Sequence, residues 1–183
     1  MNRLTFVLLL GVAILMSFVE ARGILREGIF GTRINVLPVL ALYAAMRGDL
    51  YLVLGFALVG GLMFDTLSAN PLGLSVVSLT LLGVGLVQAR DLILRDQALA
   101  QMALGFSVGV LSPVLDLFLI LFLGLSPAIG WGTLGQIAIM GLSGAVLAPF
   151  FFLLFDWLEH ELTFAEEPFS RFRSEVEIKR GRG

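Results

Sequence analysis

Six apolar stretches, separated by charges and turn-forming residues, make up most of the chain. They cover residues 4–19, 34–46, 50–67, 74–88, 98–125 and 131–158. A helix rises about 1.5 Å per residue, so roughly 20 apolar residues cross the hydrocarbon core of a bilayer. The third, fifth and sixth stretches meet that length. The pattern predicts an all-α integral membrane protein with about six transmembrane helices.

The second stretch is the shortest and carries Pro38 in its first turns. Arg33 precedes it and Arg47 follows it. Arginine side chains can extend to the membrane interface while their aliphatic stems stay in apolar surroundings. We therefore expect this stretch to span by borrowing flanking residues, with both arginines at the interfaces.

The first stretch has a second interpretation. Arg3, the apolar run and the Val19-Glu20-Ala21 sequence are also typical of a signal peptide with a small-residue cleavage site. The run is at the long end for a signal peptide, and five more apolar stretches follow. We favour a retained helix.

Composition agrees with a membrane protein. Hydrophobic residues make up 58% of the 183 residues and charged residues 14%, whereas soluble domains have about 45–50% and about 25%. The absence of cysteine excludes disulfides, thiol chemistry and cysteine-based metal sites. A net charge of −2 without a basic stripe disfavours nucleic acid as a partner.

Basic residues predict the orientation. With six spans, all of the twelve basic residues except Arg22, Arg26 and Arg33 lie on the side of the two termini. Cytoplasmic loops carry the excess of lysine and arginine, so both termini are predicted to be cytoplasmic. Residues 1–158 then form the transmembrane domain. Residues 159–183 form a cytoplasmic tail of mixed charge, partly ordered or interfacial.

Three carboxylates, Asp65, Asp116 and Asp156, lie within or at the ends of the predicted helices. Ionisable groups inside a membrane are functional candidates by default. Asp65 and Asp156 lie near helix ends, where they can reach headgroups or water, and Asp65 could pair with Arg33. Asp116 is more embedded. It could pack helices or hold a water molecule, or it could contact a ligand or partner.

Residues 105–116 combine small residues with a helix-breaking proline. Gly105 and Gly109 form a GxxxG motif, which allows helix backbones to approach closely in lipid. Pro113 frees the carbonyl of Gly109, so a kink and a small polar pocket near Asp116 are expected. The motif could face another helix of this chain or a partner protein.

Motifs of catalysis are not found. The sequence has no P-loop, GxGxxG or HExxH motif. His160 is a lone histidine at the membrane edge, and Ser75, Ser78 and Thr80 lack a histidine or lysine that would activate a nucleophile. We therefore expect no catalytic residue, metal site or cofactor. An intramembrane enzyme is the least favoured of the functions considered.

Residues 37–73 carry a recognisable combination. Pro38 and Tyr43 lie in the second stretch, and the third stretch ends in Gly60-Gly61-Leu62-Met63-Phe64-Asp65 before the Pro71-Leu72-Gly73 turn. This resembles the rod shape-determining protein MreD family. Members have a proline-containing second helix with a tyrosine, a G-x-L-x-x-D end to the third helix, and a P-L-G turn. Pro38, Tyr43, Gly61, Asp65, Pro71 and Gly73 match that pattern.

The resemblance implies a non-catalytic scaffold of the bacterial cell-elongation machinery, which builds peptidoglycan in rod-shaped cells. Such proteins are multi-pass proteins of the inner membrane and work with the bitopic protein MreC, with MreB, with RodA and with a class B penicillin-binding protein. Their fold is similar to the S-components of energy-coupling-factor transporters. In this setting Asp65 would hold the outer end of the third helix against its neighbours. The long mixed-charge tail departs from the family.

The shared fold leaves an alternative from another class: a small-molecule (vitamin-type) binding subunit of an energy-coupling-factor-like transporter. This alternative predicts an outward pocket lined by polar groups near Asp65, Asn70 and Asp116. Few such groups are present, and the predicted outer loops are short for a lid. The scaffold is therefore the preferred hypothesis.

Overall fold

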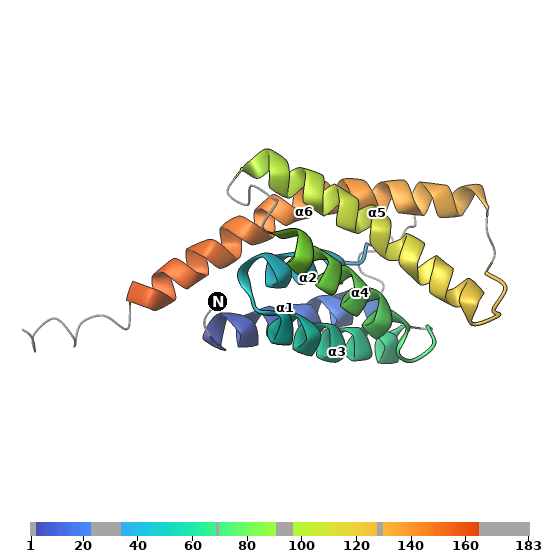
Figure 1. The fold of residues 1–183 in the computed structure, drawn as a ribbon, viewed down its shortest axis with the longest axis horizontal. Helices are drawn as coiled ribbons and strands as arrows, with labels where there is room; N and C mark the ends of the chain where they lie inside the picture. The colour runs from blue at the N-terminus through green and yellow to red at the C-terminus, as the bar shows by residue number, and fades with distance from the viewer. Residues whose placement is uncertain (1–2, 23–33, 69, 91–96, 128–129, 165–183) are drawn as a thin grey trace, which may run out of the picture.

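Six α-helices form the regular structure of the chain in the computed structural model, which describes residues 3–22, 34–68, 70–90, 97–127 and 130–164 (Figure 1). The helices are α1 (Arg3–Ala21), α2 (Leu37–Arg47), α3 (Leu50–Leu67), α4 (Leu74–Ala89), α5 (Ala98–Phe122) and α6 (Trp131–Phe164). Each corresponds to one predicted apolar stretch, so the all-helical prediction is confirmed. Helix α6 continues beyond the predicted end at residue 158 and takes the first part of the predicted tail with it.

Four of the helices, α1, α3, α5 and α6, are long and apolar enough to cross a membrane. The other two are shorter, with 11 residues in α2 and 16 in α4. At about 1.5 Å per residue, α2 extends over only about half of the hydrocarbon core. The chain therefore has the helices of a multi-pass membrane protein, four of them at full length.

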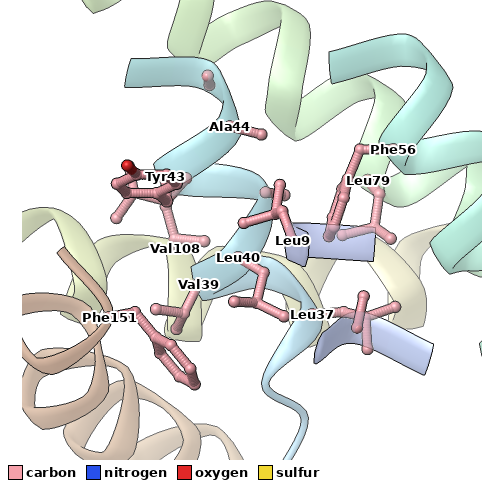
Figure 2. Packing of buried hydrophobic residues seen from close by; sticks show 14 of the residues in the cluster. Leu9, Leu37, Val39, Leu40, Tyr43, Ala44, Phe56, Leu79, Val108 and Phe151 are labelled. Carbon is pink, nitrogen blue, oxygen red and sulfur yellow. The ribbon is translucent and has the colours of Figure 1, made fainter. Parts of the chain in front are cut away.

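The short helix α2 is the centre of the molecule. Every residue from Leu37 to Met46 is buried, and α2 contacts each of the other five helices. Figure 2 shows its side chains pointing in several directions, toward residues such as Leu9 of α1, Phe56 of α3 and Phe151 of α6. A helix that is apolar on all sides belongs in an interior. Protein therefore surrounds α2 where lipid surrounds an ordinary span.

The remaining helices enclose α2 in two groups. Helices α5 and α6 pack along each other on one side, α1 and α3 lie together on the other, and α2 and α4 lie between (Figure 1). Helix α6 bends near its middle, where it contains Pro149. Proline removes a helical hydrogen bond and clashes with the preceding turn, which accounts for a bend there.

Consecutive helices run in alternating directions. The last residue of α2, Arg47, forms an ion pair with Asp156 near the end of α6, and Arg90 at the end of α4 donates a 2.8 Å hydrogen bond to the carbonyl oxygen of Gly48. Helices α2, α4 and α6 therefore end together. Helix α1 begins at this same end (Figure 1), which we call the inner end; the opposite end is the outer end.

The outer surfaces of the helices are those of a lipid-facing protein. Large apolar side chains such as Val7, Phe118 and Leu153 are more than half exposed, and apolar exposure on this scale marks a membrane or partner surface. Trp131 and Trp157 are exposed near opposite ends of α6. They lie about 39 Å apart along a helix path, close to the thickness of a bilayer with its headgroups, where tryptophan concentrates.

Candidate functional site

Asp65 joins α3 to α4 at the outer end. Its side chain is only 2% exposed. One oxygen accepts a 2.8 Å hydrogen bond from the Gly73 N–H, and both oxygens lie 3.2 Å from the Ser75 N–H. The first N–H groups of a helix have no partner within the helix and carry partial positive charge. Asp65 therefore caps α4. We call Asp65, Gly73 and Ser75 the outer clasp.

Two glycines make the outer clasp possible. Gly73 adopts φ 92° directly before α4, a backbone conformation that residues with a Cβ rarely adopt. A Cβ atom on Gly61 would lie 2.8 Å from the Cα and N atoms of Val76, so only glycine permits this approach of α3 to α4. Between the helices, the carbonyl oxygen of Pro71 accepts a hydrogen bond from the Leu74 N–H.

The other two motif residues belong to α2. Pro38 is in the first turn, where a missing N–H costs nothing. The Tyr43 ring stacks on Phe155 at 4.9 Å and meets Phe152 edge-on at 5.2 Å. Its hydroxyl donates a 3.4 Å hydrogen bond to Asp156. Tyr43 thus connects the central helix to α6.

An ion pair at the inner end joins Arg47 and Asp156, two residues singled out in the sequence. Arg47 was expected at a membrane interface and Asp156 near headgroups or water. In the structure, Arg47 Nη2 lies 2.7 Å from Asp156 Oδ2, a pairing that was not predicted from the sequence. The two side chains are about one third exposed, so they lie at the edge of the protein interior. Their positions are 109 residues apart in sequence, which left no local signal for the pairing.

The GxxxG face of α5 is occupied by α6. A Cβ atom on Gly105 would collide with the carbonyl oxygen of Gly144, and one on Gly109 with the carbonyl oxygen of Met140. A Cβ on Gly144 would in turn collide with the Gly105 carbonyl oxygen. These glycines let the two helix backbones touch, so this face packs within the chain.

Beyond this crossing, Pro113 and Asp116 line a cavity of about 210 Å³ at the outer end. It is also lined by residues of α1, α3, α4 and α6, by Asn35 before α2 and by Asn70 in the α3–α4 turn. Its other polar lining residues are Glu20, Asn35, Asn70, Thr133 and Gln136. One carboxylate oxygen of Asp116, Oδ1, is buried and has no hydrogen-bond partner among the described residues.

Only part of this cavity is predictable from the sequence. Asn70 and Asp116 line it, whereas Asp65 lies apart in the outer clasp. Asn35 and Thr133 were missed because they lie at helix ends, where polar residues usually serve as caps, and Asn35 does accept a hydrogen bond from the Leu37 N–H. Gln136 was missed because it is a single polar residue in the second turn of the long apolar helix α6. Arg33 lies outside the described residues, and so does its predicted pairing with Asp65.

Within the described residues, no three His, Cys, Asp or Glu side chains group as a metal site would require. Comparison with family models, curated proteins and solved structures gives no match. The likeness to the MreD family therefore depends on the residues quoted for it and on the positions that they take in the fold.

Proposed function

We propose that this protein is a non-catalytic scaffold of the bacterial cell-elongation machinery, of the MreD type, in the cytoplasmic membrane. The observation that carries the proposal is the outer clasp, together with the turn that connects α3 to α4. The family pattern includes Gly61, Asp65, Pro71 and Gly73. In the structure these residues lie together where α3 joins α4, and each contributes a contact or a backbone conformation to that connection. A chance match of a glycine-rich helix would not require such a connection.

The proposed topology has six crossings with the inner end in the cytoplasm. Alternating helix directions and the excess of basic residues on the side of the termini support it. Of the two short helices, α2 crosses within a shell formed by the other five, so lipid need not match the length of α2. The S-component-like arrangement belongs to the same proposal.

Cysteine labelling tests the topology because the chain has no cysteine of its own. Leu72, 72% exposed in the α3–α4 turn, and Asp49, exposed in the α2–α3 turn, lie at opposite ends of α3. In spheroplasts, Leu72→Cys should react with a membrane-impermeant maleimide, and Asp49→Cys should react only after permeabilisation. Labelling of Asp49→Cys in intact spheroplasts would contradict the orientation.

The partner proposed for this scaffold is a bitopic MreC-type protein, whose single helix needs a lipid-facing surface. The α5 glycines are covered by α6, so the surface lies elsewhere. The outer face of α1 carries the exposed residues Val7, Gly11, Leu15 and Phe18, and a Cβ atom on Gly11 would meet no atom within 4 Å. Small residues at such a site admit a second helix closely.

Affinity purification of the tagged protein from native membranes in mild detergent, with mass spectrometry, tests the scaffold. A bitopic MreC-type protein should be recovered in near-stoichiometric amount, and MreB, RodA or a class B penicillin-binding protein with it. Gly11→Leu should reduce that recovery. Gly85→Leu on α4, where a Cβ also meets nothing within 4 Å, is the matched control. Equal recovery with both variants would remove the α1 face from the proposal.

The cavity at the outer end favours the alternative, a small-molecule-binding subunit of an energy-coupling-factor-like transporter. The same purification separates the two functions. Recovery of a transporter ATPase and its coupling subunit, with no bitopic partner, would refute the scaffold and support the transporter subunit.

A further inference from the structure

The outer cavity is rich in hydrogen-bond acceptors and negative charge. Of the described residues that line it, two carry carboxylates, three carry amides and one carries a hydroxyl, and none of these is a lysine or arginine. The carboxylates come from opposite parts of the chain, Glu20 at the end of α1 and Asp116 in α5. A carboxylate can only accept hydrogen bonds when it is ionised. The lining therefore suits a ligand that donates hydrogen bonds and carries positive charge.

Asp116 is the group of the cavity that most needs a partner. Its Oδ1 atom is buried without a hydrogen bond from any described residue. The buried Ser78 hydroxyl of α4 lies near Asp116, and its oxygen also has no hydrogen-bond partner among the described residues. Buried polar atoms are nearly always paired, and carboxylates at membrane depth pair with cations or donors. An organic cation in the cavity would supply both the positive charge and, through its N–H groups, the hydrogen-bond donor for Oδ1.

The remaining wall of the cavity is apolar. Leu117, Ile120 and Ile137 contribute to it, and an apolar hollow of about 350 Å³ adjoins it at Leu117 and Ile137. An engineered cavity of about 150 Å³ in another protein holds benzene. At about 210 Å³ this cavity has room for one aromatic ring with a charged substituent.

We propose that the outer cavity binds a small amphipathic organic cation. An amidinium, guanidinium or primary ammonium group lies against Asp116, and a flat apolar body lies along Leu117, Ile120 and Ile137. The geometry carries the inference through the cavity, its acceptor-rich lining and the unpaired Oδ1 of Asp116. The inference does not depend on the scaffold proposal, because the α1 face proposed for the partner lies outside the cavity.

Benzamidinium and benzamide form a suitable pair of probes, since they share size and shape and differ in charge. Binding of each probe to the full chain is measured by isothermal titration calorimetry at pH 7, in nanodiscs of phosphatidylcholine, a zwitterionic lipid without net charge. Benzamidinium should bind saturably and at least tenfold more tightly than benzamide. Asp116→Asn should abolish that preference, and Asp49→Asn, at an exposed residue at the inner end, should keep it.

Ile120→Trp gives a second test that leaves every carboxylate in place. The larger side chain fills part of the cavity and should weaken binding of benzamidinium at least tenfold, with the melting temperature of each variant measured as a check of folding. The proposal is overturned if wild-type protein binds neither probe saturably or binds both equally. It is also overturned if folded Asp116→Asn, or folded Ile120→Trp, binds benzamidinium as wild type does. None of these binding results changes the result expected when a bitopic partner is co-purified, so the two proposals can fail separately.

Discussion

Replacing Asp65 by alanine should destabilise the protein, because it removes the side chain that caps α4 from α3. The substitution removes the acceptor of two backbone N–H groups, those of Gly73 and Ser75. Hydrogen bonds to charged groups contribute about 1.5–3 kcal/mol each, and loss of a helix cap costs about 0.5–2 kcal/mol. These ranges overlap because they describe the same contacts. With Asp65 2% exposed, solvent screening is small, and we expect a loss of about 2–4 kcal/mol.

The magnitude converts to a measurable shift. In soluble domains of this size, 1 kcal/mol changes the melting temperature by about 2–4 °C, so Asp65→Ala should lower it by on the order of 10 °C. Trp131 and Trp157 provide the fluorescence signal in nanodiscs. Asp65→Asn keeps one acceptor oxygen and should show a smaller decrease. This graded order distinguishes a capping role from a simple packing role.

Asp49→Ala is the matched control. Asp49 is the N-cap residue of α3, and Asp65 caps α4. Unlike Asp65, Asp49 is exposed and its side chain makes no capping hydrogen bond. The control should melt within about 2 °C of wild type, since uncapped surface substitutions usually change stability by about 0.5 kcal/mol or less. If Asp65→Ala melts together with Asp49→Ala, the outer clasp does not hold α3 to α4 and the reasoning fails.

Three further predictions use the same melting assay. Gly105→Ala should lower the melting temperature strongly, because its methyl group collides with α6 backbone, whereas Gly135→Ala, whose Cβ meets nothing within 4 Å, should not; equal effects would contradict the packing described for α5 and α6. Single charge reversals of Arg47 and Asp156 should each destabilise, and the double reversal should recover about 1 kcal/mol, with additive effects arguing against a coupled pair. Tyr43→Phe should cost less than about 1 kcal/mol because its 3.4 Å hydrogen bond is long, and Tyr43→Ala about 3–5 kcal/mol because it empties the buried ring cluster; similar losses would mean that the hydroxyl matters more than the ring.

The helices were predictable because each apolar stretch is bounded by residues that stop a membrane helix. The third stretch agrees with α3 at both ends, where Asp49 precedes it and a turn with Pro71 and Gly73 follows. Proline and glycine act through the local backbone, so their effect is present in the sequence. The capping role of Asp65 is also partly local, since Gly73 is only eight positions away.

The position of α2 was not predictable from its residues. Lipid and protein interiors are both apolar, so the sequence of an apolar helix does not show which of the two surrounds it. The residues of α2 therefore predict a short span with arginines at the interfaces. The structure adds that α2 lies inside the bundle and that Arg47 pairs with Asp156. The polar residues of the outer cavity, such as Asn35 and Gln136, likewise meet only through the tertiary fold.

One geometric cause connects the glycine motif to the cavity. Gly105 and Gly109 bring α5 into backbone contact with α6 at one level, and Figure 1 shows the two helices lying apart at the outer end. Pro113 lies four residues beyond Gly109 along α5, and Asp116 lies about one turn further along. Helices held together at one level and separated at another enclose a space that side chains do not fill. The close packing of the small residues is therefore what leaves Asp116 facing a cavity, so a bulkier residue at Gly105 should alter benzamidinium binding as well as stability.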